Sequence, residues 1–333
     1  MIICFLNAIL SIWFYITPLH LAAKKNYKEI IDLLLSVKGI EIYNDCFKDC
    51  FLITQITIPS YVTSIGNSAF KKCESLEQVK ILSPLTSIGD FTFYDCSSLK
   101  EITIPSSVTL IGNYAFFQCS SLTQITIPPS VTSIQKMAFC KCLSLTQITF
   151  STPSSVVSIG ENAFFDCSSL KEIQLPPSVT SIGDNCFKEC KLLERVTIPP
   201  SVSLIGKAAF FKCKNVKEIT IPPSVTSIED NTFNECTSLK QVMIQSSIKS
   251  IGNYAFFRCS SLSQIEFPSS LVSIGQFAFC ECSSLAHISI PPSVTSIGMG
   301  AFGICLSLKS VEIPSNINTS AIGFGSSVTI MKI

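Results

Sequence analysis

Cysteine is the residue type whose number and spacing could support chemistry in this sequence. Seventeen cysteines occur among 333 residues, and twelve of them recur at intervals of 23 residues, with one interval of 25. Such a series can form disulfides, bind metal ions or pack as buried thiols. Its members are Cys50, Cys73, Cys96, Cys119, Cys142, Cys167, Cys190, Cys213, Cys236, Cys259, Cys282 and Cys305.

Disulfides along this series would require copies of the repeat to stack. Stacked strands lie about 4.8 Å apart, which a disulfide tolerates between Cα atoms. Side chains in register point in parallel, however, so their Cβ atoms stay farther apart than the preferred value of about 3.8 Å. Unpaired cysteine is among the most buried residue types and packs as a small hydrophobe. We therefore predict buried, reduced thiols.

Two cysteine pairs have a spacing that superficially suggests zinc ligands. Cys140 and Cys142 form "FCKC", and Cys280 and Cys282 form "FCEC". The second cysteine of each pair belongs to the inward series, and the pairs lie six copies of the repeat apart, so they cannot share one ion. We expect no metal site.

Histidine offers little more, since His20 and His287 are the only two. Neither has a Cys, Ser or Asp at a spacing that suggests nucleophilic catalysis, and no glycine-rich phosphate loop occurs. We therefore expect no catalytic residue, no cofactor and no small-molecule substrate. A thiol or zinc enzyme is a remote alternative.

The cysteines must be positioned by a repeat, of which residues 120–142, "SSLTQITIPPSVTSIQKMAFCKC", are one copy. A phenylalanine stands three residues before each cysteine of the series, and we predict that these side chains form the core. The phenylalanine series is Phe47, Phe70, Phe93, Phe116, Phe139, Phe164, Phe187, Phe210, Phe233, Phe256, Phe279 and Phe302.

Each copy predicts a strand, a bend, a second short strand and a short helical turn. In "LTQITI" (122–127) apolar residues are separated by polar ones, as in a half-buried strand. Pro128 ends this strand because it has no N–H to donate. After the second strand comes a glycine, such as Gly112, where we expect a positive φ. An Asn or Asp, such as Asn113, often follows and is typical of a helix start.

A single copy cannot bury its apolar side, whereas copies stacked in register form a continuous core. The period therefore predicts a repeat solenoid: a right-handed coil with a parallel β-ladder, short helical turns and about twelve coils of 23 residues. At the usual strand spacing, such a stack would be roughly 55 Å long.

The pattern "LxxIxIPxSVTSIGxxAFxxCxxL" resembles the BspA-like leucine-rich-repeat family over about residues 42–318. The resemblance implies a surface antigen or adhesin-like protein that attaches to host or neighbouring-cell components. Residues 17–42, "TPLHLAAKKNYKEIIDLLLSVKGIEI", separately resemble one ankyrin repeat, in which His20 would be a structural hydrogen-bonding residue. Since one ankyrin copy cannot bury both of its faces, we expect it to pack on the first leucine-rich coil.

The predicted domains are an apolar N-terminal segment (1–16), the ankyrin-like repeat (17–42), the leucine-rich repeats (43–317) and a C-terminal cap (318–333). The cap is expected to lack the Phe and Cys series. The apolar segment can be a signal peptide, a membrane anchor or a helix covering the ankyrin copy. For an anchor, Lys24 and Lys25 would keep the repeats on the cytosolic side by the positive-inside rule.

The charge balance argues against nucleic acid as a partner. Lys and Arg number 24 against 23 Asp and Glu, which leaves no field to attract polyanions. Membrane contact is expected only through residues 1–23. The remaining partner class is protein.

The exposed side of the strand ladder, which we call the strand face, is the candidate binding surface, and we expect it to be concave. In three consecutive coils its charges alternate in sign between neighbours, which predicts a checkerboard that helps fix the register. The candidate binding residues are Thr123, Gln124, Thr126, Lys171, Glu172, Glu194, Arg195, Lys217, Glu218, Lys240, Gln241, Gln264 and His287. A second, apolar stripe of Phe117, Phe165, Phe211 and Phe257 is expected to pack at the coil edge.

We interpret the sequence as a non-enzymatic protein-binding module. Resemblance implies display at a cell surface. The cysteines instead suit a reducing compartment, and no clean export signal is visible, so an intracellular ankyrin and leucine-rich-repeat scaffold is the alternative.

Overall fold

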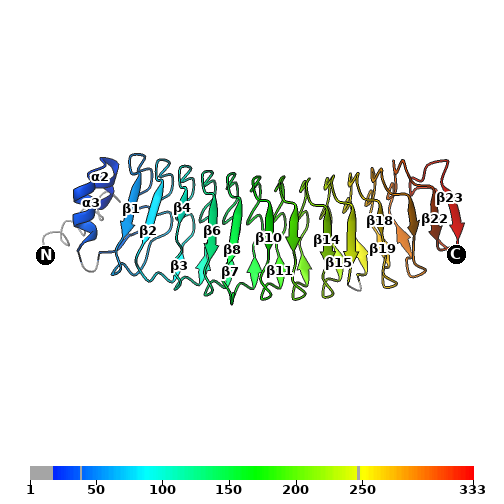
Figure 1. Cartoon of the computed structure of the whole chain (residues 1–333), viewed down its shortest axis with the longest axis horizontal. Coiled ribbons are helices and arrows are strands. Elements are labelled where there is room, and N and C mark those ends of the chain that lie inside the picture. Colours follow the sequence, from blue (N-terminus) through cyan, green and yellow to red (C-terminus); the bar gives the residue numbers. More distant parts are fainter. Residues whose placement is uncertain (1–17, 38–39, 246–247) are drawn as a thin grey trace. The chain divides into compact units, whose positions relative to one another are not determined.

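The structure is a computed structural model that describes residues 18–37, 40–245 and 248–333 (Figure 1). The apolar segment 1–16 lies outside the described residues, so its three interpretations stay predictions. The chain divides into two compact units, Met1–Val156 and Val157–Ile333, and each is described by itself. Among the residues described, no helix is long and apolar enough to cross a membrane.

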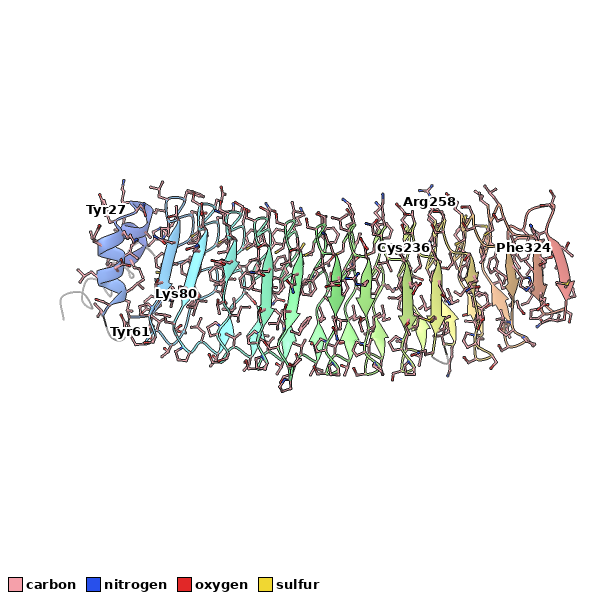
Figure 2. All side chains as sticks on the ribbon, in the orientation of Figure 1. Tyr27, Tyr61, Lys80, Cys236, Arg258 and Phe324 are labelled. Carbon is pink, nitrogen blue, oxygen red and sulfur yellow. The ribbon has the colours of Figure 1, made fainter. Side chains whose placement is uncertain are left out.

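The first unit begins with two short helices, α2 (Pro18–Lys24) and α3 (Lys28–Leu35). Helix α3 buries Ile31, Leu34 and Leu35. Tyr61 lies beside the helices (Figure 2), and its hydroxyl donates a hydrogen bond to the Leu35 carbonyl oxygen. His20 Nδ1 lies 3.0 Å from the Cys46 carbonyl oxygen. These bonds join the helices to the first coils, so the predicted packing of the ankyrin-like copy and the structural role of His20 are confirmed.

The rest of the first unit is a stack of coils, each with a longer and a shorter strand (Figure 1). All strand pairs are parallel, and they join residues 23 apart. The strands at the "LxxIxI" position, which we call the longer strands although β4 has only two residues, are β1 (Gln55–Ile58), β2 (Gln78–Ile81), β4 (Glu101–Ile102), β6 (Gln124–Ile127) and β8 (Gln147–Phe150). The shorter ones are β3 (Ser87–Ile88), β5 (Leu110–Ile111) and β7 (Ser133–Ile134).

The second unit repeats this arrangement with parallel strands in the same register. Its longer strands are β10 (Glu172–Gln174), β12 (Arg195–Thr197), β14 (Glu218–Ile221), β16 (Gln241–Ile244), β18 (Gln264–Ile265), β20 (His287–Ser289), β22 (Ser310–Ile313) and β23 (Thr329–Lys332). The shorter ones are β9 (Ser158–Ile159), β11 (Ser181–Ile182), β13 (Leu204–Ile205), β15 (Ser227–Ile228), β17 (Ser250–Ile251), β19 (Ser273–Ile274) and β21 (Ser296–Ile297).

The phenylalanine series forms the core of both units. All twelve side chains are fully buried. In the first unit, ring centroids lie 4.8 Å apart for Phe47 and Phe70 and 5.1 Å apart for Phe116 and Phe139. The rings are nearly parallel, because each coil places its ring directly above that of its neighbour. The solenoid with twelve phenylalanine-centred coils is therefore confirmed.

The C-terminal tail differs from the prediction that it lacks the Phe series. The Phe324 ring stacks on Phe302 at 5.7 Å between centroids, and β23 pairs in parallel with β22. The tail thus adds a shortened coil, with Thr329 opposite Ser310. Its phenylalanine escaped the sequence pattern because the coil has fewer residues than the repeat. The role of the tail as a cap stays a prediction.

The "AFxxC" segment forms a run of reverse turns where a short helical turn was predicted. The amides of Ser68, Phe70 and Lys72 donate to the next coil, to the carbonyl oxygens of Asp90, Thr92 and Tyr94 at 2.9, 2.9 and 2.7 Å. Ser68 and Lys72 have left-handed φ values of 57° and 60°. This alternation turns every second amide toward the neighbouring coil, which a helix would prevent by directing all amides along its own axis.

The regular recurrence of glycine along the chain has a different cause from the one predicted. Among the described glycines, only Gly300 and Gly323 have a positive φ. At Gly183, an added Cβ would lie 2.6 Å from the amide nitrogen of Glu161 in the preceding coil, and at Gly252 it would lie 2.5 Å from that of Asp230. Glycine is required there because two backbones approach closely, and not because of its backbone freedom.

The Asn or Asp after the glycine also has a partner in another coil. The Asn113 amide donates to Asp90 Oδ1 at 2.7 Å, and the Lys207 amide donates to Asp184 Oδ1 at 2.7 Å. In each case the acceptor belongs to the preceding coil. The predicted role of this Asn or Asp as a helix start is therefore wrong. Its side chain accepts a hydrogen bond from the backbone amide of the residue 23 positions later.

Proline determines which longer strands pair over four residues. Four pairs do so: β1 with β2, β6 with β8, β14 with β16, and β22 with β23. In each, the residue after the second strand is not proline, and its amide donates to the preceding coil. These bonds run from Leu82 to Ile58, Ser151 to Ile127, Gln245 to Ile221 and Ile333 to Ile313, at 2.8, 3.0, 3.1 and 3.0 Å.

Where proline follows the strand, the ladder is shorter or stops. Strands β4 and β6 belong to different sheets, as do β12 and β14, and β18 and β20. Pro128 and Pro222 directly follow β6 and β14, and Pro291 lies two residues after the end of β20. The missing N–H explains the interruption, because proline cannot donate to a ladder.

The outward phenylalanines are half-buried at the turn edge of the coils, as predicted. The Phe117 ring stacks on Tyr94 at 4.8 Å between centroids. In the second unit, the Lys188 ammonium lies 5.0 Å from the centroid of Phe211. Arg258 lies at the turn edge (Figure 2), and its guanidinium is 5.0 Å from the centroid of Phe257. Intramolecular stacking and cation–π contacts therefore engage this stripe.

Candidate functional site

In the first unit, the strand face carries two columns of exposed polar side chains. Because successive side chains of a strand point to opposite sides, the first and third residues of each "QITI" face outward while both isoleucines are buried. The register places Gln55 opposite Gln78 and Gln124 opposite Gln147, with Thr126 opposite Thr149. The result is a rigid array of amide and hydroxyl groups.

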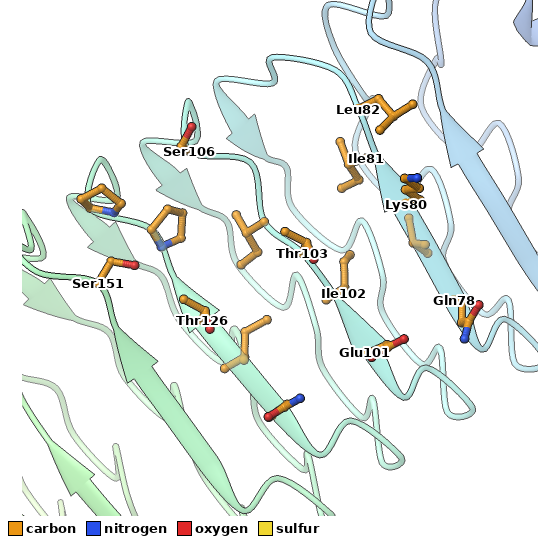
Figure 3. A pocket seen from close by; sticks show the side chains of 16 residues that line it. Gln78, Lys80, Ile81, Leu82, Glu101, Ile102, Thr103, Ser106, Thr126 and Ser151 are labelled. Atoms are coloured by element: carbon orange, nitrogen blue, oxygen red, sulfur yellow. The ribbon is translucent and has the colours of Figure 1, made fainter.

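This face is hollowed over β2, β4 and β6 (Figure 3). The hollow has a volume of about 920 Å³, and the predicted residues Gln124 and Thr126 lie in its lining. Thr123, at the edge of the same strand, is exposed and its hydroxyl donates to the Lys100 carbonyl oxygen at 3.5 Å. The structure thus places all three predicted first-unit residues at or beside this hollow.

Sequence reasoning missed other residues that line the hollow, chiefly Lys80, Leu82, Glu101 and Thr103 (Figure 3). Leu82 is 51% exposed, although it is a large apolar residue. Three of these residues depart from the repeat, which could have identified them from the sequence. Lys80, Leu82 and Glu101 stand where the repeat usually has Thr, Pro and Gln. The hollow itself depends on how neighbouring coils meet and has no sequence signal.

A second hollow of about 460 Å³ lies between helix α3 and strand β1. Lys28, Ile31 and Asp32 of the helix side line it together with Thr57. Gln78 and Lys80 line both hollows. The ankyrin-like helices therefore form a wall at one end of the hollowed surface.

In the second unit, the predicted charge alternation produces ion pairs between coils. Arg195 Nε donates to Glu172 Oε2 at 3.0 Å, and Lys217 Nζ lies 3.7 Å from Glu194 Oε2. All four side chains are substantially exposed, so solvent screens the attraction and each pair contributes little to stability. Lys171 and Glu218 are exposed on the same face.

The remaining predicted residues lie farther along the same unit. Lys240, Gln264 and His287 are exposed, and Gln241 is half-buried. His287 Nδ1 and Ser310 Oγ are hydrogen-bonded at 2.8 Å. Register aligns Gln241 with Gln264, so the two form part of a polar column. Binding by any of the predicted residues stays a proposal.

The cysteine series is buried and present as thiols throughout the described chain. Ten members donate a hydrogen bond from Sγ to the phenylalanine carbonyl oxygen of the preceding coil, at 2.9 to 3.2 Å. Cys213, for example, donates to Phe187 at 3.1 Å. Each of these ten cysteines therefore links its own coil to the previous one.

These thiols are poorly suited to chemistry. Desolvation raises the pKa of Cys50 and of Cys305 to about 12, and it raises the pKa of Cys213 well above the ordinary value. Since the thiolate is the nucleophile and metal ligand, these groups stay protonated and inert. Among the residues that the structure describes, no cluster of three or more His, Cys, Asp or Glu is placed to hold a metal ion.

Parallel coils with a buried leucine and phenylalanine core and a polar strand face define a leucine-rich-repeat solenoid. Residues 40–152, 149–262 and 205–323 match the "BspA type Leucine rich repeat region (6 copies)", and residues 15–45 match the ankyrin repeat. The chain belongs to the BspA-type leucine-rich-repeat family. Comparison with curated proteins gives no match.

Two solved structures are similar over most of their length. A leucine-rich repeat protein from Bacteroides ovatus is 32% identical, with 88% of this chain and 87% of that chain covered and a TM-score of 0.59. A leucine rich cell surface protein from Faecalibacterium prausnitzii is also 32% identical, with 88% and 82% covered and a TM-score of 0.55.

Proposed function

We propose that this chain is a non-enzymatic protein-binding module that engages partners through its strand face, as a BspA-like surface antigen or adhesin-like protein. The observation that carries the proposal is the in-register array of exposed amide, hydroxyl and charged side chains on backbone that ladders and turns hold rigid. Rigid, repeated polar surfaces lose little conformational entropy on binding. Solenoids generally use such extended surfaces for recognition.

Burial of the cysteines supports binding over catalysis. All cysteines of the described residues are buried, and desolvation raises the pKa of Cys213 well above its ordinary value, which keeps this thiol protonated. The similar protein from Faecalibacterium prausnitzii is described as a cell surface protein, which supports the surface role for this chain.

Site-specific photo-crosslinking tests the proposal. A photoreactive amino acid would replace Gln124 or Lys240 on the strand face, or Thr132, which is exposed beside a shorter strand, as the control. The labelled proteins would be exposed to intact cells and to a cell lysate. We expect discrete protein adducts from the two strand-face positions and none from Thr132. Adducts from Thr132 alone, or none at all, would contradict binding through the strand face.

An intracellular scaffold is the second candidate, favoured by the buried thiols and the ankyrin match. Buried thiols suit a reducing compartment. Antibody staining of intact and permeabilised cells separates the two candidates, since only a surface protein stains without permeabilisation. Thiol-reactive labels are unsuitable for this purpose, because the described thiols are buried wherever the folded protein resides.

A further inference from the structure

The hollow over β2, β4 and β6 combines three departures from the repeat. Lys80 occupies the column of outward threonines, Glu101 the column of glutamines, and Leu82 the column of prolines. All three side chains are exposed and line the hollow (Figure 3). The corresponding residues in neighbouring coils are Thr57, Thr103 and Thr126; Gln55, Gln78 and Gln124; and Pro59, Pro105 and Pro128.

The two charges of the hollow lack the compensation found elsewhere on the strand face. In the second unit, Arg195 pairs with Glu172 and Lys217 with Glu194. In the first unit, Lys100 pairs with Glu77 at 2.7 Å. Within the described residues, neither Lys80 nor Glu101 forms an ion pair. A cation and an anion are therefore available to a partner in the same hollow.

Leu82 adds an apolar contact beside the cation. Its amide donates to the Ile58 carbonyl oxygen at 2.8 Å, which fixes the backbone, while its side chain stays 51% exposed. An exposed apolar side chain at the end of a polar strand face can pack against a side chain of an extended peptide that lies across the strands.

The three side chains are spaced for an extended peptide that runs along the strands. Register places Glu101 level with Gln78, so Glu101, Lys80 and Leu82 follow one another at steps of two residues along the strand direction. One face of an extended peptide repeats at the same step, about 6.7 Å. A partner with a basic, an acidic and an apolar residue at alternate positions would match all three.

We infer that this hollow binds an extended protein segment in which a basic residue meets Glu101, an acidic residue meets Lys80 and an apolar residue packs on Leu82. The inference rests on the proposed function and assigns the binding to the first unit. The order of the three side chains fixes the direction of the segment, since reversing it would place its basic residue on Leu82 and its apolar residue on Glu101.

The test uses the chain's own repeat to design variants that preserve the fold. Lys80→Thr, Leu82→Ser and Glu101→Gln install residues that other coils carry at these positions, Ser151 providing the precedent for Leu82→Ser. Met243→Thr is the matched control, because Met243 is exposed at the position equivalent to Lys80 in β16 of the second unit. Circular dichroism and melting temperature confirm that each variant is folded.

A display library of random peptides of about twelve residues would be panned on the full wild-type chain. We expect enriched peptides to carry the basic, acidic and apolar residues at alternate positions. Affinities measured by fluorescence polarisation should fall about tenfold or more with Leu82→Ser, because an apolar contact is lost. They should fall about two- to fivefold with Lys80→Thr or Glu101→Gln, and stay unchanged with Met243→Thr. Lys80→Glu should restore affinity for a peptide whose acidic residue is changed to lysine.

Failure to enrich any peptide, or peptides whose affinity none of the three variants lowers, would overturn the inference. Binding to polysaccharide alone would also count against it. If affinity falls with Met243→Thr and not with the first-unit variants, the strand face still binds protein but this hollow is not the site. The inference would then fail while the proposed function stands.

Discussion

At the residue scale, each coil is held to its neighbour by side chains with partners one coil away. The Cys213 thiol donates to the Phe187 carbonyl oxygen, and the Asp184 carboxylate accepts from the Lys207 amide. The Phe187 ring lies between those of Phe164 and Phe210, at 5.5 and 5.4 Å. A change at one position of a coil therefore affects the adjoining coils.

Phe187→Ala should lower the free energy of unfolding by about 3–5 kcal/mol, because it removes a fully enclosed ring and leaves a cavity. The side chain is 0% exposed. Chemical denaturation followed by circular dichroism measures the loss. Leu192→Ala is the control in the same coil, since Leu192 is 44% exposed and should cost less than about 0.5 kcal/mol. A loss below about 1 kcal/mol at Phe187 would mean that the ring stack does not carry the core.

The residue pattern predicted positions better than it predicted partners. The buried Phe and Cys series followed directly from the period. The glycine and Asn or Asp positions were recognised, but a positive φ and a helix cap are both explanations within one coil. The actual partners of Gly183 and Asp184 are the backbone of Glu161 and the amide of Lys207. Such partners follow only once the stacking register is known.

At the element scale, the position after each longer strand controls sheet continuity. The sequence predicted that proline ends a strand, and the structure adds that proline also shortens or ends pairing with the preceding coil. Pro222 and Gln245 show the contrast on the two sides of β14: β12 and β14 belong to different sheets, whereas β14 and β16 pair over four residues. This explains why a single repeat yields several short sheets.

Pro222→Ser should extend the ladder between β12 and β14, because the new amide can donate to the Ile198 carbonyl oxygen. Hydrogen exchange should show a protected amide at position 222 and slower exchange in Glu218–Ile221. The gain of about 1 kcal/mol from a hydrogen bond is offset by the lost rigidity of proline in the unfolded chain, so the stability should change little. Unchanged exchange rates would contradict this role of proline.

Gln245→Pro is the converse variant. It removes the amide that donates to the Ile221 carbonyl oxygen at 3.1 Å. Exchange in Gln241–Ile244 should accelerate, and unfolding should become easier by about 1–3 kcal/mol, because a carbonyl group loses its donor. Protection equal to that of the wild-type chain would show that side-chain packing alone maintains the strand pairing.

The charged strands make a smaller contribution. Glu194→Lys breaks the ion pair with Lys217 and places a third cation in a column with Lys171 and Lys217. The melting temperature should fall slightly, in line with a loss of about 0.2–1 kcal/mol for an exposed pair. Adding Lys217→Glu should recover most of this loss. An unchanged or raised melting temperature in the single variant would defeat the register role of the charges.

At the scale of the whole molecule, the period predicted the solenoid but not the local shape of its surface. Columns of equivalent residues follow from stacking, so a polar strand face was predictable. The hollow, with Lys80, Leu82 and Glu101, arises where two adjacent repeats depart from the others and the ladder stops. A repeat consensus averages over such departures, and these are the positions where binding specificity can arise.

The buried thiols make the stability of the whole molecule sensitive to alkaline pH. Desolvation raises the pKa of Cys50 and Cys305 to about 12 and also raises the pKa of Cys213 and Cys236, whereas a thiol in the unfolded chain has a pKa of about 8.5. Above that value the unfolded chain loses protons that the folded chain keeps. The stabilisation is therefore complete below about pH 8.5 and is lost as the pH rises toward the folded values.

Each such thiol can lower the free energy of unfolding by up to about 1.4 kcal/mol per pH unit, so the series should make the loss steep. Urea denaturation in reducing buffer, from about pH 7.5 to about pH 9.5, should show a falling midpoint. Cys213→Ala combined with Cys236→Ala removes two titrating groups, so this variant should lose stability less steeply with pH even if it is less stable at neutral pH. An equal slope in both proteins would mean that groups other than the buried thiols control the alkaline transition.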